Sequence, residues 1–207
     1  MTEDLKPYNY LEDGKLKGLS AELVQKLLKA FDYNTTIEVL PWARAINLLQ
    51  AKDNAILFSM SYSKERAKKY KFACPLSEVD VYLFVKNNKH LTLNSMKDLK
   101  GLKIGVVKDF SAHKTLLEKG FTEFDYSSST AAMIKKLQQE KIDTFVAAPF
   151  TVYSLDIDTA RIQQTPLKLY STQLCIGFNK SISDEQVRKW EKGLQQFRND
   201  GTYEKLY

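Results

Sequence analysis

Cysteine and histidine are scarce in this sequence, which has two residues of each kind among its 207. Cys74 and Cys175 show no C-x-x-C motif and no Cys/His ligand spacing, and His90 and His113 are too few and too isolated to suggest zinc. The sequence therefore predicts no metal site. A disulfide needs the two cysteines to meet in space, which a sequence does not show, and we expect two buried free thiols instead.

Long apolar runs are absent as well. No stretch approaches the roughly 18 residues that a membrane-spanning helix needs, and no signal-type hydrophobic segment follows Met1. We therefore expect no membrane span, in a chain that is either cytoplasmic or the mature part of an exported protein.

Motifs of the common enzyme classes are also missing. The sequence has no G-x-S-x-G nucleophile elbow, no Walker phosphate loop and no G-x-G-x-x-G after a strand. The carboxylate pairs Glu3-Asp4 and Asp156/Asp158 belong to turns, where adjacent acids are usually solvated, and nothing places either pair across a cleft. The residues alone predict no catalytic group and no cofactor.

The net charge of +6 does not indicate a nucleic-acid partner. Lysines are spread from Lys6 to Lys205, and acidic residues lie between them almost throughout. No run of aromatic residues interleaved with basic ones is present. We interpret the charge as a mildly basic, solvated surface.

The hydrophobic residues, 43% of the chain, follow an alternating order of helical and strand-like patterns. Strands are expected at residues 35–40, 55–60, 79–85, 103–107, 124–126, 144–147 and 174–178. Helices are expected at residues 19–31, after Pro41, at 111–119, after 127–130, at 150–155 and from Ser183 to Gly201, and a capped turn at 95–101. This alternation is typical of an α/β fold with parallel strands.

The order of these elements predicts two lobes. Two similar βαβ units are separated by the strong strand at 79–85, and another strand returns near the end of the chain. We therefore expect the chain to cross twice between the lobes. The last helix, with Trp190 in its apolar face, is expected to pack back on the first lobe.

A serine-rich stretch, Ser59–Arg66, is the strongest candidate for a binding site. The preceding residues 55–58 are expected to form a buried strand, so the serines leave its carboxyl end in a turn whose N–H and O–H groups can donate. Arg66 adds a planar, permanently charged guanidinium that matches a carboxylate with two parallel hydrogen bonds. Taken alone, the stretch also fits a solvated loop with one solvated arginine.

Three motifs stand in a defined order along the chain. Residues 7–8 (PY) and 13–18 (DGKLKG) precede the first helix, residues 59–66 (SMSYSKER) follow the strand at 55–60, and residues 98–106 (DLKGLKIGV) begin the second half. In this order and spacing they resemble the bacterial extracellular solute-binding proteins of family 3, which take polar amino acids for ABC importers. The resemblance covers nearly the whole chain.

The resemblance implies a type II periplasmic-binding-protein fold, in which two α/β lobes joined by two crossover strands close on a ligand without performing chemistry. Lobe 1 would comprise residues 1–83 and 174–207, and lobe 2 residues 84–173. It further implies a monomer in the periplasm, trimmed of its signal peptide, that binds an amino acid or another organic carboxylate and delivers it to an ABC-transporter permease. No cofactor is implied.

The resemblance also implies roles for particular residues. Arg66 would pair with the ligand carboxylate, while Ser59 and Ser61, with Met60 between them, would line the site. Glu3 would reach the ligand side chain. Tyr8 and Trp42 would offer an apolar or stacking surface, although for Trp42 a place in the core is an equally good interpretation.

Two departures from the family pattern concern the second lobe. The family's D-A-x-x-x-D ends in an aspartate that binds the α-ammonium of the ligand, and here residues 143–148 (DTFVAA) have Ala148 in that place. The family's G-[ST] is here Phe110-Ser111, so that Ser111 and the helix start still suit an anion while Phe110 adds bulk. A ligand without an ammonium group therefore fits as well as an α-amino acid.

Three other functions stay open. The chain would serve equally well as the ligand-sensing input domain of a receptor. An enzyme on the same scaffold, as in dehydratase-like relatives, would need a general acid or base, for which Glu3 is the candidate. A sensing domain of a transcription regulator would need a DNA-binding segment, which this sequence lacks.

Overall fold

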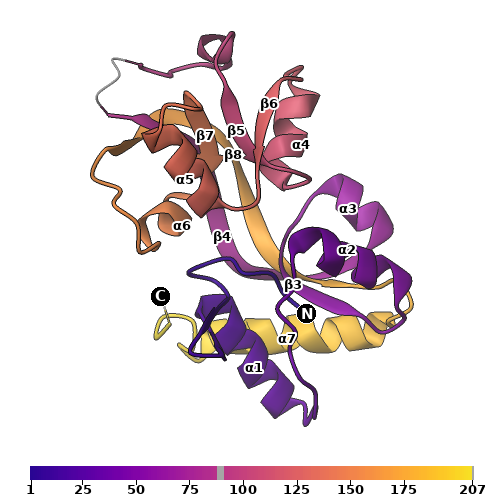
Figure 1. Ribbon diagram of the computed structural model, residues 1–207. Coiled ribbons are helices and arrows are strands. Elements are labelled where there is room, and N and C mark those ends of the chain that lie inside the picture. The colour runs from indigo at the N-terminus through magenta and orange to yellow at the C-terminus, as the bar shows by residue number, and fades with distance from the viewer. Residues whose placement is uncertain (88–90, 207) are drawn as a thin grey trace. The chain divides into compact units, whose positions relative to one another are not determined.

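The computed structural model describes residues 1–87 and 91–206, so His90 lies outside the described residues (Figure 1). The chain divides into two compact units. Unit 1 is Met1–Glu78 with Thr172–Tyr207, and unit 2 is Val79–Ser171. The lobe boundaries expected from the sequence stay a prediction. A lobe is a part of the chain that moves as one rigid body, and this division into units reflects compactness alone.

Two long strands run from one unit into the other, so the chain crosses between the units twice (Figure 1). These strands are β4 (Lys71–Lys86) and β8 (Ile162–Phe178). Both are longer than the runs expected from the sequence, residues 79–85 and 174–178. The added residues have mixed polarity and partial exposure, so their pattern alone did not indicate a strand.

Unit 1 is built from a hairpin, four helices and a sheet. Its elements besides β4 and β8 are β1 (Tyr10–Glu12), β2 (Lys15–Lys17), α1 (Leu19–Ala30), α2 (Trp42–Ala51), β3 (Ile56–Ser61), α3 (Lys64–Lys69) and α7 (Asp184–Asn199). Asp13 and Gly14 join β1 to β2 with φ angles of 52° and 71°, which suit a tight hairpin turn. The helices and strands expected at 19–31, after 41, at 55–60 and after 183 are thus confirmed.

Gly18 precedes α1 at a position that excludes any side chain. Its φ angle is 112°, and a Cβ atom there would lie 2.5 Å from the carbonyl oxygen of Pro7 and 2.6 Å from that of Tyr8. The same Tyr8 carbonyl accepts hydrogen bonds from the backbone N–H groups of Ser20 and Ala21 at 2.9 and 3.1 Å. The glycine therefore lets the N-terminal segment pack against the start of the helix.

Helices cover the β3 strand of unit 1 on both faces. Phe58 belongs to a buried cluster that contains residues of α1 and α7, including Leu27 and Trp190. Leu57 and Met60 belong to a second cluster with Ala45 and Leu49 of α2, and the irregularity between these two residues lets both join it. This two-sided burial explains why the strand reads as a continuous apolar run.

The packing of α7 in unit 1 confirms the expected position of the last helix. Trp190 is only 2% exposed, and its ring meets that of Phe31 edge to face with centroids 5.4 Å apart. A Cβ atom on Gly193 would lie 2.5 Å from Cδ2 of Leu27, so the glycine permits the close approach of α1 and α7. Ser183 and Gln186 form the expected capping box.

The strand expected at residues 35–40 is wrong. Residues 33–38 form no regular element, and Val39 makes one isolated bridge with Thr2. The β-branched residues favour an extended chain here, but its pairing is limited to the backbone bonds from Thr2 N to Glu38 O and from Leu40 N to Thr2 O. The charged helix α3 was not expected at all, because its six residues carry no apolar periodicity.

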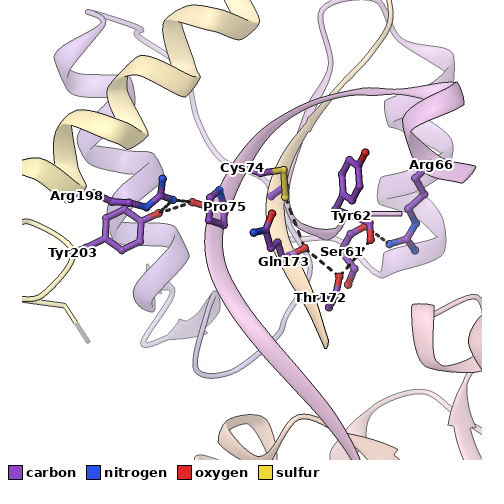
Figure 2. The surroundings of a disulfide bond; sticks show 10 residues. Ser61, Tyr62, Arg66, Cys74, Pro75, Thr172, Gln173, Arg198 and Tyr203 are labelled. Carbon is purple, nitrogen blue, oxygen red and sulfur yellow. Dashed lines mark hydrogen bonds between the residues drawn. A yellow bond between two sulfur atoms is a disulfide. The ribbon is translucent and has the colours of Figure 1, made fainter. Parts of the chain in front are cut away.

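The two cysteines form a disulfide, so the expectation of two free thiols is wrong. In unit 1, β8 lies between β3 and β4, and this pairing brings the Cα atoms of Cys74 and Cys175 to 4.7 Å from each other. Next to the disulfide, the carbonyl oxygen of Pro75 accepts hydrogen bonds from Arg198 and Tyr203 (Figure 2). The sequence could not show this contact because 101 positions separate the cysteines.

Unit 2 contains a mixed sheet in the order β4-β7-β5-β6. Its elements are η1 (Met96–Leu99), β5 (Ile104–Val107), α4 (Ser111–Glu118), β6 (Phe124–Ser127), α5 (Thr130–Gln138), β7 (Thr144–Ala147) and α6 (Pro149–Tyr153). Strand β5 pairs in parallel with β6 and β7, whereas β4 pairs with β7 antiparallel. These elements confirm the α/β alternation expected for the second half.

Within the described residues, no helix is both long enough and apolar enough to cross a membrane.

Replacing both cysteines by alanine should lower the free energy of unfolding by about 2–4 kcal/mol, because the disulfide closes a long loop in the unfolded chain. Urea unfolding of the variant and the wild-type protein measures the difference, and reductant should lower only the wild-type value. Finding two titratable thiols in the denatured, unreduced chain would contradict the disulfide.

Candidate functional site

Strand β3 ends in an irregularity that places the serines of the 59–66 motif. The antiparallel register of β3 with β8 shifts between Leu57 and Met60, and Ser59 within this shift has a φ angle of 61°. A serine in this left-handed region is uncommon. The side chain of Ser59 is buried, at 3% exposure, and its Oγ atom has no hydrogen-bond partner among the described residues.

Arg66 is held close to the end of the same strand. It lies in α3, which begins after Ser63, and the Oγ atom of Ser63 accepts a hydrogen bond from the backbone N–H of Arg66 at 3.1 Å. Its Nη1 atom donates to the carbonyl oxygen of Ser61 at 2.9 Å (Figure 2). The guanidinium carbon lies 4.9 Å from the centroid of the Trp42 ring, a cation–π contact.

These contacts make Arg66 a fixed cation rather than a solvated side chain. Its exposed fraction is 7%, although it lies on a six-residue helix whose other charged side chains are exposed. A buried charge needs compensating groups, and the Ser61 carbonyl and the Trp42 ring provide part of them. The interpretation of residues 59–66 as a solvated loop is therefore wrong.

Glu3 is a buried acid in the same unit. It is 8% exposed, and burial raises the pKa of its carboxyl to about 8, while the charge of Arg66 opposes this rise and that of Asp4 adds to it. Asn9 donates its side-chain N–H to the backbone carbonyl of Glu3 at 2.6 Å, which holds the segment. At neutral pH the carboxyl is therefore mostly protonated and able to donate a hydrogen bond.

The three remaining candidates of unit 1 lie at different depths. The Met60 side chain is fully buried in the cluster with Ala45 and Leu49, which leaves its backbone as the part that could face a ligand. Tyr8 is 4% exposed. Trp42 is half-buried, packs against the Met60 cluster and stacks with Arg66. It therefore has contacts with the core, as one interpretation expected, and a stacking contact, as the other expected.

The candidates of unit 2 lie at the starts of two helices. Phe110 precedes α4 and Ser111 is its first residue, and both are half-buried. Ala148 follows β7 and precedes α6, where Pro149 is the first helical residue. These three residues come from the carboxyl ends of strands, where α/β folds commonly bind ligands.

The sequence analysis missed one contact at the start of α4. The backbone N–H of Asp109 donates to Nδ1 of His113 at 3.2 Å. The bond uses a backbone N–H, which every residue except proline has, so the sequence carried no specific signal for it.

Among the residues that the structure describes, no three histidine, cysteine or acidic side chains gather as a metal site would require. The chemistry that unit 1 offers is instead that of anion recognition: a fixed guanidinium, a buried hydroxyl and a protonated carboxyl.

Comparison with known proteins agrees with this architecture. The model of the bacterial extracellular solute-binding proteins, family 3, matches residues 1–207. The "Probable amino-acid-binding protein YxeM" of Bacillus subtilis is 26% identical over 97% of this chain and 78% of its own length. The arginine-binding extracellular protein ArtP of the same organism is 23% identical over 98% of this chain and 81% of its own.

A solved structure shows the same fold. It is a histidine kinase sensor domain with similarity to periplasmic binding proteins, with a TM-score of 0.89 and 20% identity over 99% of this chain and 92% of its own. At this identity the likeness concerns the fold alone. The type II periplasmic-binding-protein fold expected from the sequence is thereby confirmed.

Replacing Glu3 by glutamine should change how stability depends on pH. Because the folded protein holds the Glu3 proton up to a pKa of about 8 and the unfolded chain releases it near 4.5, wild-type stability should fall as the pH rises between these values. The variant lacks this loss, so its advantage over wild type should grow by on the order of 4 kcal/mol across that range. Urea unfolding at both ends of the range measures it.

Glu65 provides the matched control, since it is an exposed acid in the same unit. A change of slope that appears in Glu3→Gln and not in Glu65→Gln would belong to the buried carboxyl rather than to the loss of any one negative charge. Parallel pH profiles for Glu3→Gln and wild type would show that Glu3 titrates normally.

Proposed function

Because the chain belongs to the bacterial extracellular solute-binding proteins, family 3, we propose that it binds a small polar solute through a carboxylate group. It delivers this solute to the permease of an ABC importer and performs no chemistry on it. The observations that carry the proposal are the buried guanidinium of Arg66, which is held at the Ser61 carbonyl, and the buried hydroxyl of Ser59, which has no partner among the described residues. The names of the relatives, which concern amino acids, support the class of ligand.

Arg66 is the proposed partner of the ligand carboxylate. A guanidinium forms two parallel hydrogen bonds with a carboxylate, and these bonds are stronger where water is excluded. The bond to the Ser61 carbonyl and the stacking on Trp42 reduce the freedom of the Arg66 side chain before the ligand arrives. Binding therefore costs less conformational entropy than it would at a mobile arginine.

Ser59 is proposed as a second donor to the ligand. A buried hydroxyl without a partner costs stability in the ligand-free protein. The presence of such a hydroxyl has a physical reason if a ligand oxygen accepts its hydrogen bond. Ser61 is proposed to contribute in the same way, through its hydroxyl or its backbone, and Met60 through its backbone.

Glu3, Tyr8 and Trp42 are proposed to contact the rest of the ligand. With its pKa raised to about 8, Glu3 would donate a hydrogen bond to a polar group of the ligand at neutral pH. The aromatic rings would cover apolar or planar parts of the ligand. A protonated carboxyl also suits a general acid, so the pKa of Glu3 does not separate binding from the dehydratase-like alternative.

Phe110, Ser111 and Ala148 are the proposed contacts from unit 2. Ser111 lies at the amino-terminal end of α4, where backbone N–H groups favour an anion. Ala148 supplies no carboxylate for an ammonium group, so an organic carboxylate without this group is as suitable a ligand as an α-amino acid. The family's description as extracellular supports a location in the periplasm.

Sensing instead of delivery is the alternative role. Both roles begin with the same binding event, and the likeness to a kinase sensor domain concerns the fold. The proposed residues are therefore the same in both. A monomeric state stays a prediction.

Ser59→Ala should weaken ligand binding without weakening the fold. A hydrogen bond to a charged group contributes about 1.5–3 kcal/mol, so the dissociation constant should rise roughly 10- to 150-fold. The free energy of unfolding should stay equal or increase, because the Oγ atom that is lost bonds to none of the described residues. Calorimetric titration and urea unfolding measure the two quantities.

Ser20→Ala is the matched control for this variant. Ser20 also has a buried, unpartnered hydroxyl, but it lies on α1 rather than at the end of β3. It should leave the dissociation constant unchanged. Equal effects of the two variants on affinity would contradict a direct role of Ser59.

A thermal-shift screen should identify the ligand class. The screen compares L-arginine, L-cystine and L-histidine with succinate, since the relatives suggest amino acids and Ala148 suggests carboxylates without an ammonium group. A solute at about a hundred times its dissociation constant stabilises the fold by roughly 2.7 kcal/mol. Arg66→Ala should abolish the thermal shift. Arg66→Lys should reduce it, because an ammonium group cannot form the two parallel hydrogen bonds that a guanidinium forms with a carboxylate. An unchanged shift in Arg66→Ala would contradict carboxylate binding by this residue.

A further inference from the structure

The loop between β5 and α4 has an unusual conformation and no ordinary helix cap. Asp109 lies in the left-handed region with a φ angle of 63°. Phe110 occupies the N-cap position, and its side chain has no oxygen or nitrogen that could accept a hydrogen bond from the first turn. Ser111, a proposed ligand contact, follows directly, so the conformation of this loop decides where Ser111 lies.

His113 ties the loop to the helix in another way. It is the third residue of α4, and its Nδ1 atom accepts the hydrogen bond from the backbone N–H of Asp109 at 3.2 Å. A glutamine at the same helical position performs the related task in α7, where Oε1 of Gln186 accepts from the backbone N–H of Ser183 at 3.4 Å. The imidazole, a side chain within the helix, therefore accepts a hydrogen bond from the backbone of the loop that precedes the helix.

Packing holds the imidazole ring in this orientation. His113 is 6% exposed, and the rings of Phe124 and Tyr126 on β6 meet it edge to face with centroids 5.1 and 5.4 Å away. The hydroxyl of Tyr126 lies 3.4 Å from Nε2. Since Nδ1 accepts, the single proton of the neutral ring is on Nε2, facing this hydroxyl.

We propose that neutral His113 is a positioning residue, which holds residues 108–111 in the form that binds the ligand and releases this loop when it takes up a second proton. The proposal rests on the proposed function, because the loop carries Ser111. Protonated His113 has a hydrogen on Nδ1, which faces the N–H of Asp109 and cannot accept from it. Ligand affinity should then fall in acid.

Burial and the charges around the ring together favour the neutral form of His113. Burial is the largest cause that lowers the pKa of His113, Lys108 and Lys114 lower it further, and Asp109 opposes them. On β6, Asp125 lies next to Tyr126 and is ion-paired with Lys136. With the pKa below its ordinary 6.5, the bond from Asp109 is complete above that value and is lost as the pH falls through the folded-state pKa.

The ligand-free protein provides the first test. The chain has two histidines, so His113→Gln assigns the imidazole signals in a nitrogen NMR titration. Nδ1 of His113 should be unprotonated at pH 7.5, and the amide signals of residues 109–111 should shift, with faster hydrogen exchange, as the ring takes up its second proton. Unchanged amides through that titration would overturn the proposal.

Three variants provide the second test by calorimetric titration, with L-arginine as the probe of the pH profile, because its carboxylate stays ionised over this range, and succinate as a second probe at pH 7.5. Wild-type affinity should fall by about tenfold per pH unit below the pKa of His113. His113→Gln, which keeps an acceptor but does not titrate, should bind as wild type does at pH 7.5 and lose this dependence. His113→Phe should bind weakly at every pH, and Tyr126→Phe, which keeps the ring contact, should bind normally.

A pH profile of His113→Gln that equals the wild-type profile would overturn the proposal. So would normal binding by His113→Phe. If neither probe binds while the amides of residues 109–111 follow the His113 titration, the loop-holding role of His113 stands and the proposed function fails for these two solutes.

Discussion

The position of β8 between β3 and β4 is the constraint on which unit 1 depends. The last residues of β8 pair with β3, and the disulfide joins β8 to β4. The register of β3 against β8 shifts between Leu57 and Met60, and the shift puts Ser59 into its left-handed conformation. The geometry of the candidate site thus follows from how one strand fits its neighbour.

The candidate site concentrates groups that would cost stability elsewhere in a fold. Arg66 and Glu3 are buried ionisable groups, and Ser59 has a buried hydroxyl that finds no partner in the part of the chain that the structure describes. Proteins tolerate such groups mainly where they perform a function, because burial without compensation is unfavourable. The proposed carboxylate ligand would compensate two of them at once, by neutralising the guanidinium and accepting from the hydroxyl. His113 in unit 2 is likewise a buried titratable group, and its Nδ1 atom accepts a hydrogen bond from the loop N–H of Asp109.

Local patterns predicted much of the fold. Strands β3, β5, β6 and β7 lie within one residue of the expected ranges, because short apolar runs between turn residues have few other stable conformations. The capping box at the start of α7 was predicted from two residues, Ser183 and Gln186. The strand expected at 35–40 failed because β-branched residues favour an extended chain but cannot supply a partner strand. Likewise, the burial of Arg66 could not be inferred, since every residue of its helix α3 except Ala67 is charged.

The sequence by itself determined the α/β class, most of the helices and strands, and the likeness to a family that identified residues 59–66 as the place to look. These features depend on residues close together in the chain, whose spacing is visible in the sequence. Only the tertiary structure decided that Cys74 bonds Cys175, that Ser59 lacks a partner and that Trp42 stacks on Arg66. Each of these depends on residues brought together by strand pairing and helix packing, because a contact across many residues is set by the whole fold rather than by any local pattern.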